Sequence, residues 1–387
     1  MSGAQDVVIG IGIGGGGRYP ASPESTLDLG VHHPSAHGLL RLHLRVDGEH
    51  IVSADPEIGF MHRGAEKLME VRDYRQGLVL ANRHDWLSAF AGELGLALTV
   101  EHMLGLAVPQ RAIWLRTLLA EVTRVFSHLS FLGSFPVGTG TPSPASFAFQ
   151  ERDAVAQLLE EISGGRLHLM LTRIGGLRAD APEGWLERAS SVVTQLRARV
   201  DSVAGFIDDQ EFRDHARGIG IITAEQVLAY GVTGPIARAA GVDLDLRRDE
   251  PYLAYGELTD VLKVVTRDTG DCLARAEVIR DQLVVSLDLI AACVQRLNEM
   301  ASGPVNVPLP KTLRAPEGSH YCWTESPLGI SGYLVVSRGE RTPWRVKMRT
   351  PSFNNLAALG EVLAGTNVAS LTTIVGSMYY VIGDVDR

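Results

Sequence analysis

Cysteine is scarce in this chain. Three cysteines occur among 387 residues, at Cys272, Cys293 and Cys322, and no two of them form a CxxC pair. An odd number at wide spacings argues against a disulfide framework and against a four-cysteine metal cluster. We therefore expect a protein of a reducing, cytoplasmic compartment.

Lysine and long apolar runs are also scarce, and arginine supplies the other cations. Lysine occurs four times, and the net charge is −9 with a pI near 5.8. This balance argues against nucleic-acid binding, which needs a basic face for the phosphates. No apolar run reaches the roughly 20 residues of a membrane-spanning helix, because the best candidate, Leu283 to Val294, contains Asp288. Membrane contact is therefore expected to come through partners.

Histidine, by contrast, is concentrated near the start of the chain. Seven of the twelve histidines precede residue 86, and several lie in two glycine-containing segments, 30–38 and 55–67. Imidazole titrates near neutral pH, so this crowding predicts a site of proton transfer. His33 and His37 have the spacing of a helical metal pair, but Pro34 turns His33 away from helix. A turn whose rings bond to backbone is the alternative, and we predict no metal site.

The sequence divides into an arm and one large domain. Residues 1–28 are rich in Gly, Ser and Pro and are expected to be flexible. Their glycines also suggest a dinucleotide loop of a soluble dehydrogenase, but no strand–turn–helix unit with a downstream acid follows. Residues 29–387 are expected to form a single domain. It comprises a β-hairpin region at 29–60, a helical core at 61–300 and a β/α region at 320–387.

Local patterns place the elements of this domain. Residues 39–46 alternate and return at 50–54 across Asp47-Gly48, which predicts a hairpin. Apolar spacings of three and four predict helices, and a Gly/Pro/Ser/Thr stretch at 133–146 predicts an interruption. The predicted helices cover 86–104, 110–132, 147–163, 182–206 and 271–300. A second hairpin is expected at 330–349, followed by a short helix and an apolar strand at 371–382. The fold class is α+β, with a central helical bundle flanked by small N- and C-terminal β-sheets.

Several motifs in a fixed order resemble one family. They are His33-Pro34-x-x-His37-Gly38, Gly59-x-x-His62-Arg63-Gly64-x-Glu66-Lys67, residues 121–129, Arg166-Leu-His168, Gly270-Asp-Cys272 and Gly383-Asp-Val-Asp-Arg387. From about residue 28 onward, this order resembles the 49 kDa (D-type) subunit of NADH:quinone oxidoreductase, the respiratory complex I. The resemblance implies the fold of nickel–iron hydrogenase large subunits.

The resemblance also implies roles for individual residues. His37 is expected to donate a hydrogen bond to a quinone carbonyl, with His33 as a neighbour. Arg63, Arg83 and His168 are expected beside an iron–sulphur cluster held by a partner subunit, where a cation favours the reduced cluster. The alternative interpretation of these arginines is a solvated surface charge.

The departures from the family pattern lie in the same site. Trp86 replaces the tyrosine that bonds the other quinone carbonyl, and an indole donates but does not titrate. Gly138 and Tyr379 stand where the family has aspartates, the first of which orients the quinone histidine. His84 is an additional imidazole that either compensates for them or lies exposed at a helix end. The positions of the hydrogenase metal-binding cysteines hold Asp85, Ser88, Met378 and Val381, which cannot hold a thiolate-bound centre.

The function implied is that of a complex I subunit. The chain would form a quinone-reduction cavity with Trp86, His84, Asp85, Ser88, Gly138 and Val381 near it, and couple electron transfer to proton translocation. Expected partners are the B-like iron–sulphur protein, the C-like protein and the H-like membrane protein of complex I, at the cytoplasmic side of a bacterial cell membrane. The substrate would be menaquinone or ubiquinone, and this chain alone would bind no cofactor. The alternative is a diverged structural or assembly paralogue with an impaired or altered quinone site.

Overall fold

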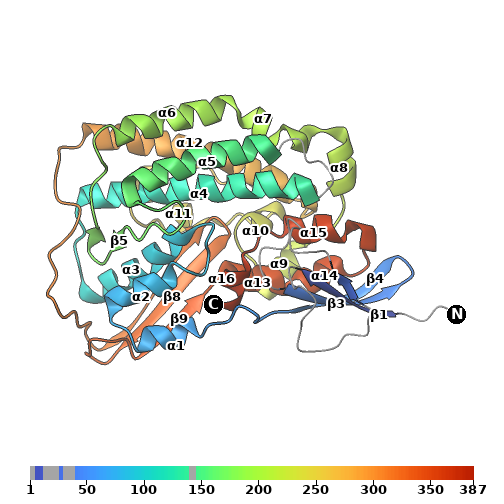
Figure 1. The fold of residues 1–387 in the computed structure, drawn as a ribbon, viewed down its shortest axis with the longest axis horizontal. Helices are drawn as coiled ribbons and strands as arrows, with labels where there is room; N and C mark the ends of the chain where they lie inside the picture. Colours follow the sequence, from blue (N-terminus) through green and yellow to red (C-terminus); the bar gives the residue numbers. More distant parts are fainter. Residues whose placement is uncertain (1–4, 12–25, 29–39, 139–144) are drawn as a thin grey trace.

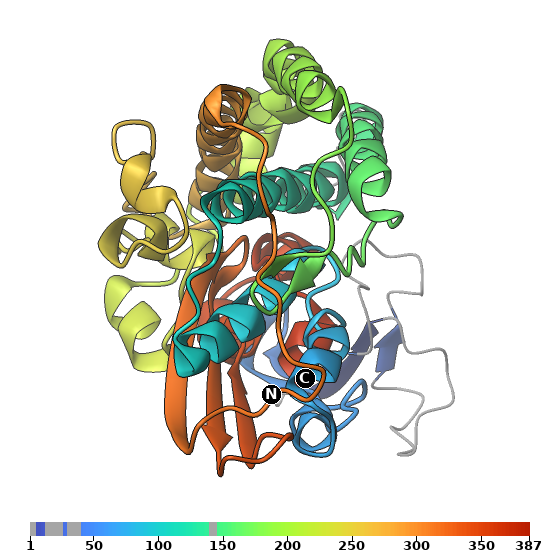
Figure 2. The ribbon, with the colours of Figure 1, turned by 90° about the vertical axis from the view of Figure 1, so that its left-hand side faces the viewer.

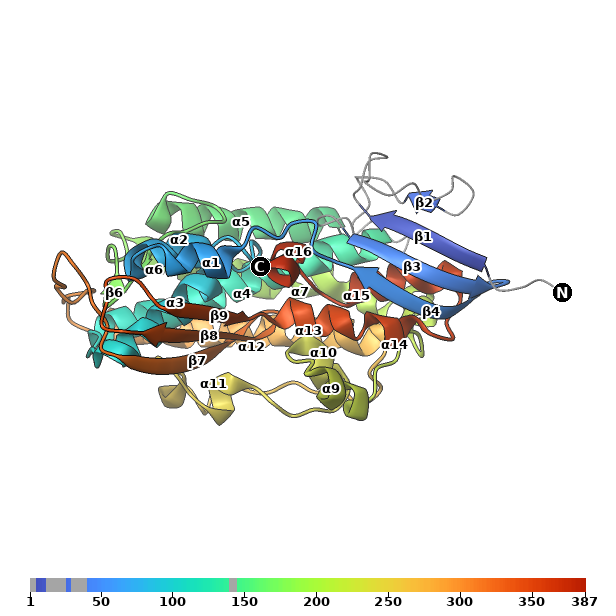
Figure 3. The ribbon, with the colours of Figure 1, turned by 90° about the horizontal axis from the view of Figure 1, so that it is seen from below.

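The computed structural model describes residues 5–11, 26–28, 40–138 and 145–387. A bundle of long helices forms one layer, and two separate sheets lie beneath it toward opposite ends of the molecule (Figure 1). Viewed from below, the C-terminal helices lie between the two sheets (Figure 3). This arrangement confirms the predicted α+β class with a central bundle flanked by small sheets.

Four helices form the bundle. Helix α4 (Gln110–Gly138) packs on α5 (Ala145–Ser163) and α12 (Cys272–Glu299), and α6 (Trp185–Ala198) packs on the same two. The indole of Trp185 is fully buried between them and donates to the carbonyl of Leu158. Burial of such apolar side chains is the main stabilising contribution to the bundle.

Helix α4 is longer than its sequence predicts. It continues through Pro136 to Gly138, so the interruption predicted from residue 133 is wrong at its beginning. Phe131 and Phe135 are buried and stack on one another at 5.0 Å between ring centroids. Tertiary packing of this apolar face outweighs the weak helix preference of the Gly/Ser/Pro composition.

The N-terminal sheet has the strand order β2-β1-β3-β4. Strands β3 (Leu40–Asp47) and β4 (His50–Glu57) form the predicted hairpin, with Leu40, Leu42 and Leu44 buried in alternation. Strand β1 (Gln5–Ile11) pairs antiparallel with β3, and β2 (Thr26–Asp28) pairs parallel with β1. The prediction of a flexible arm is therefore wrong for residues 5–11 and 26–28, because an apolar β-branched run covers the open edge of β3. The rest of that segment lies outside the described residues.

The C-terminal sheet is formed by β7 (Gly318–Ser326), β8 (Gly329–Ser337) and β9 (Arg345–Arg349), all antiparallel. The sequence predicts the hairpin of β8 and β9 but not β7. Helix α3 (Ala89–Leu104) lies on this sheet, below the bundle in Figure 2. A Cβ atom at Gly95 would lie 2.9 Å from the ring of Tyr333, so glycine permits this close approach.

Short elements connect these layers. The predicted helix at 182–206 breaks at Arg199. The predicted strand at 371–382 is wrong, because residues 371–377 form a helix and residues 378–381 are an irregular connection to the next helix, which begins at Ile382. The described residues contain no helix long and apolar enough to cross a bilayer. The remaining elements are α1 (Ala65–Glu70), α2 (Tyr74–Ala81), β5 (Thr172–Arg173), β6 (Gly176–Leu177), α7 (Val200–Ala204), η2 (Gly205–Asp208), α8 (Gln210–Ala216), α9 (Ala224–Tyr230), α10 (Pro235–Ala239), α11 (Leu246–Asp249), η3 (Tyr255–Glu257), α13 (Pro351–Ala357), α14 (Leu359–Leu363), η4 (Val368–Ser370), α15 (Leu371–Ser377) and α16 (Ile382–Asp386).

A set of fully buried charges joins the bundle to the C-terminal sheet. We call it the interior ion network. Arg247 contacts Asp245 at 2.7 Å and Glu121 at 3.2 Å, and Arg238 contacts Glu325 at 2.7 Å. Every one of these side chains is at most 1% exposed. Such pairs repay the cost of removing charge from water only while all partners are present.

Candidate functional site

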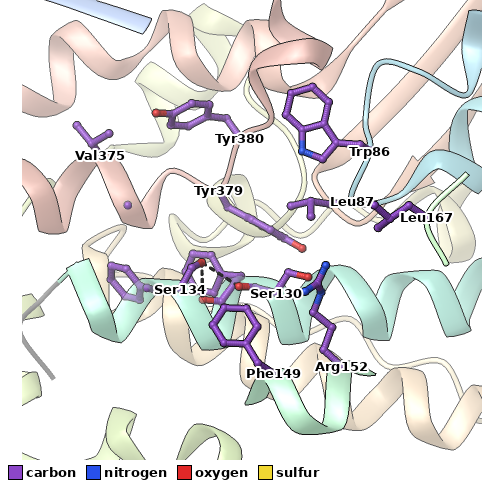
Figure 4. A pocket seen from close by; sticks show the side chains of 13 residues that line it. Trp86, Leu87, Ser130, Ser134, Phe149, Arg152, Leu167, Val375, Tyr379 and Tyr380 are labelled. Carbon is purple, nitrogen blue, oxygen red and sulfur yellow. Dashed lines mark hydrogen bonds between the residues drawn. The ribbon is translucent and has the colours of Figure 1, made fainter. Parts of the chain in front are cut away.

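A mostly apolar pocket of about 250 Å³ lies between the bundle and the C-terminal helices. Figure 4 shows side chains entering it from α4 and α5 on one side and from the segment after α15 on the other. The lining residues are Trp86, Leu87, Ser130, Phe131, Ser134, Phe135, Phe149, Arg152, Leu167, Val375, Gly376, Tyr379 and Tyr380. Apolar walls with a few polar groups are typical of small-molecule sites.

Trp86 forms part of this wall and is held there by Gly383. The indole is half-buried and packs on the backbone of Gly383, where an added Cβ atom would overlap the ring and come within 2.7 Å of the His84 carbonyl oxygen. Glycine at this position therefore sets the position of Trp86. The indole N–H has no acceptor among the described residues, which leaves one directional donor at the pocket.

Tyr379 closes the opposite wall and is fixed by hydrogen bonds. Its hydroxyl lies 2.7 Å from the Ser127 hydroxyl and 3.2 Å from His128 Nδ1, and its ring meets Phe131 edge-on. Its φ of 42° is unusual for a residue with a side chain and is maintained by this packing. Burial raises the pKa of Tyr379 well above its ordinary value, so the phenol stays protonated. It cannot replace the ionisable aspartate of the family pattern.

His128, which contacts that phenol, is fully buried. Burial, and then the charges of Arg124, Arg247 and Arg238, lower its pKa well below the ordinary value. The ring is therefore neutral at physiological pH. His128 lies between the pocket wall, through Tyr379, and the interior ion network.

Two polar side chains of the pocket have unused atoms. The Tyr380 hydroxyl and the Arg152 Nε are buried without a hydrogen-bond partner among the described residues. Arg152 instead stacks on Phe126, with its guanidinium carbon 4.6 Å from the ring centroid. Sequence reasoning missed both residues. The available signal was an arginine within the apolar stripe of a helix, between Phe149 and Val155.

Behind Trp86 lies a buried polar cluster that includes three predicted neighbours of the quinone site. His84 is 3% exposed, which contradicts its interpretation as an exposed helix-end residue. Its pKa is lowered to about 4 by burial and by Arg63, so it is neutral and a poor proton donor at pH 7. Ser88 is buried with its hydroxyl unpartnered among the described residues, at the start of α3.

Asp85, in the same cluster, interacts electrostatically with Asp384. Its Oδ1 accepts from the backbone N–H groups of Leu87 and Ser88, while its Oδ2 has no partner among the described residues. Burial, and then the charge of Asp384, raise the pKa of Asp85 to about 8. The pKa of Asp384 is raised to about 6, chiefly by burial. Two close carboxylates in a dry site cannot both ionise, so the pair retains a proton near neutral pH.

The other predicted neighbours lie at element boundaries. Val381 is buried immediately before α16, and its N–H donates to the Ser352 hydroxyl. Gly138 is the last residue of α4. Met378 is fully buried at the end of α15. His33 and His37 lie outside the described residues.

A separate group brings together Arg63, Arg83 and His168. Arg63 donates to the Arg83 carbonyl at 2.8 Å, and His168 Nδ1 lies 3.2 Å from the Asn82 carbonyl oxygen. Burial, and then the Arg83 charge, lower the pKa of His168. Both arginines are exposed and His168 is half-buried. The two arginines therefore present a cationic surface beside the Trp86 segment, and His168 lies against it.

The C-terminal motif holds the loop that carries Arg63. The Asp386 carboxylate accepts from the N–H groups of Gly59 and Met61, each at 2.7 Å, and its carbonyl contacts His62 Nδ1. Two motifs that are more than 300 residues apart thus form one unit. His62 has a structural role here.

Comparison with known proteins identifies the family. A family model described as "Respiratory-chain NADH dehydrogenase, 49 Kd subunit" matches residues 138–313 and 308–387. The first D-type subunit of the NADH-quinone oxidoreductase of Streptomyces coelicolor is 57% identical over 97% of this chain and 98% of its own length. The second D-type subunit of Streptomyces griseus is 55% identical over 97% and 95%, and the D-type subunit of Geobacillus thermodenitrificans is 39% identical over 94% and 98%. The chain belongs to the 49 kDa subunit family of respiratory-chain NADH dehydrogenases.

Proposed function

We propose that the pocket beside Trp86 forms part of the quinone-reduction cavity of this protein. As a family member, the chain is a subunit of an NADH-quinone oxidoreductase. The observation that carries the proposal is the pocket itself. It is apolar, about 250 Å³ in volume, lined by aromatic rings, and open to an indole N–H that has no acceptor among the described residues. A quinone ring is flat and apolar with acceptor oxygens, and such walls complement it.

The electron-donor side of the cavity is proposed at Arg63, Arg83 and His168. The two arginines form an exposed cationic surface next to the Trp86 segment, and His168 lies against it. Positive charge there would stabilise the reduced form of an iron–sulphur cluster held by the B-like partner protein. The C-like and H-like proteins of complex I are the further proposed partners.

The proton side is proposed at His37, with His33 nearby and Gly138 at the end of α4. The raised pKa of Asp85 supports a protonated group behind Trp86. His84 is a neutral neighbour rather than a replacement proton donor. Menaquinone or ubiquinone is the proposed substrate. We place the complex at the cytoplasmic side of the cell membrane, attached through its partners, and propose that it couples electron transfer to proton translocation.

Activity of the assembled complex tests this proposal. Trp86→Ala should reduce quinone turnover strongly and leave reduction of a soluble acceptor that bypasses the cavity unchanged. Trp344→Ala is the control, because Trp344 is 53% exposed and contacts Arg338 on the distant C-terminal hairpin. Equal quinone turnover in both variants and the unchanged complex would exclude the pocket.

The double replacement Trp86→Tyr with Gly138→Asp tests the paralogue alternative. It restores the family pattern at two departures. A native complex that already turns over quinone at ordinary enzyme rates, roughly 1 to 10³ per second, supports quinone reduction. A native complex that lacks this activity and gains it on the double replacement would instead identify an altered site.

A further inference from the structure

Arg152 is a cation placed in an otherwise apolar pocket. It projects from α5 into the pocket, and its guanidinium points toward Leu87 (Figure 4). None of the carboxylates in the described ranges lies within ion-pair distance of it, and its Nε is buried without an acceptor there. The neighbouring Arg166 differs, since it pairs with Asp153 at 2.6 Å and with Glu160 at 2.7 Å.

Packing alone does not account for this placement. The guanidinium lies over Phe126 and, at 5.9 Å, near Phe149, and a methionine would fill that space without a charge to desolvate. Burial lowers the pKa of Arg152, although the nearby charge of Asp153 acts in the opposite direction. The lowered pKa means that the charged guanidinium is destabilised by its removal from water. An arginine nevertheless remains protonated in proteins. The pocket therefore holds a permanent positive charge that no ion pair within the described residues neutralises.

Three of the four hydroxyl groups that line the pocket are already engaged, and the fourth, that of Tyr380, points away from Arg152 toward Val375 (Figure 4). Ser130 donates to the Phe126 carbonyl and Ser134 to the Ser130 carbonyl, each at 2.8 Å. The Tyr379 hydroxyl is engaged by Ser127 and His128. Apart from the Trp86 indole, Arg152 supplies the strongest hydrogen-bond donors that face the pocket.

We propose that Arg152 binds a ring oxygen of the quinone headgroup and stabilises the negative charge that arrives with the electrons. The proposal rests on the proposed quinone function of this pocket. The electrons come from the reduced cluster of the partner subunit, the quinone is the group reduced, and Arg152 keeps all its protons. Its contribution is larger in the reduced than in the oxidised ligand, because a charge-assisted hydrogen bond strengthens as charge develops on the oxygen.

The test is Arg152→Met in the assembled complex with a short-tailed quinone. The value of kcat/KM should fall about ten- to one-hundred-fold, as expected for loss of a hydrogen bond to a charged group. The fall should appear more in kcat than in KM, since the interaction strengthens on reduction. Reduction of a soluble acceptor that bypasses the cavity should not change, and Arg166→Met, which removes a paired surface charge, should behave as the unchanged complex.

Arg152→Lys is a second variant, which tests the proposal if Arg152→Met does not assemble. Lysine keeps the charge but loses the planar fork, so we expect a loss of several-fold, between the unchanged complex and the methionine variant. If kcat and KM are unchanged in both variants, the role of Arg152 is overturned while the quinone function stays in place. If the methionine variant does not assemble, unchanged kcat and KM in the lysine variant have the same meaning. No quinone reduction by the unchanged complex would overturn the proposed function itself.

Discussion

The interior ion network and the pocket differ in whether their buried charges are paired. In the network, each charge is paired with another, as Arg247 is with Asp245 and Glu121. Around the pocket, Arg152, Tyr380 and Asp85 each have a buried atom without a partner among the described residues. An unpaired buried charge is costly, and within the described ranges the Arg152 charge lacks the ion-pair partner that each charge of the network has. We infer that the network serves stability and that the pocket polar groups serve a ligand.

The largest effect is expected from breaking the network. Arg247→Met leaves Asp245 and Glu121 buried without their shared cation, which should destabilise the protein by about 3–5 kcal/mol. Thermal unfolding and the yield of assembled complex measure this loss. Arg248→Met is the control, because Arg248 is 37% exposed and pairs with surface carboxylates. Equal thermal unfolding midpoints for Arg247→Met and Arg248→Met would show that the interior ion network contributes no more stability than a surface ion pair.

A smaller effect on stability, with a large effect on turnover, is expected at Gly383. Gly383→Ala forces Trp86 away from its place, and such overpacking costs roughly 1–3 kcal/mol. Quinone turnover should fall more than the yield of complex does. Gly205→Ala is the matched control, since a Cβ atom there meets nothing within 4 Å. Retained turnover in Gly383→Ala would show that the position of Trp86 is unimportant.

The cluster behind Trp86 predicts a pH dependence of stability. Folding raises the pKa of Asp85 from 3.8 to about 8. Between these values the unfolded chain loses this proton while the folded chain keeps it. The free energy of unfolding therefore falls as pH rises, by at most about 1.4 kcal/mol per pH unit for one proton.

Asp85→Asn should flatten this dependence, because an amide resembles the protonated acid. Unfolding midpoints measured from pH 5 to pH 8.5 test it, and Asp260→Asn, at an exposed position, should keep the original slope. A slope that survives Asp85→Asn would show that the pair does not hold the proton.

The smallest effect is expected at the cationic surface. Arg83→Met removes a charge that lowers the pKa of His168, so that pKa should rise. The reduction potential of the iron–sulphur cluster that we propose on the B-like partner should fall by some tens of millivolts, because a cation favours the reduced state. A redox titration followed by electron paramagnetic resonance measures it, with Arg72→Met as an exposed control. An unchanged potential would separate this surface from the cluster.

Elements with strong local periodicity were predictable from the sequence. The hairpin at Leu40–Glu57 follows from alternation around Asp47-Gly48, and helix α12 follows from its apolar spacing. Strand β7 was missed because its residues are mostly polar, and only its pairing with β8 makes it a strand. The segment 371–382 resembles a strand by composition, but its first seven residues form helix α15 and residues 378–381 are an irregular connection to α16. Tertiary packing decided both cases.

Site residues that lie in sequence motifs could be proposed from the sequence. Site residues that come together only through folding could not. Trp86 and the Arg63–Arg83–His168 group were proposed from motifs near them, and the structure places Trp86 at a pocket and brings the other three together. The burial of His84 did not follow from its motif. The proximity of Asp384 to Asp85 and the position of Arg152 in the pocket depend on contacts between distant segments. The spacing of residues along the sequence does not predict such contacts.

Photoaffinity labelling of the assembled complex with an azido-quinone tests the central claim most directly. The account predicts labelling of peptides that carry Trp86, Phe149 or Tyr379, all of which line the pocket, and protection by excess unlabelled quinone. Label that is displaced by quinone but falls entirely on other segments of this chain or on partner proteins would contradict it.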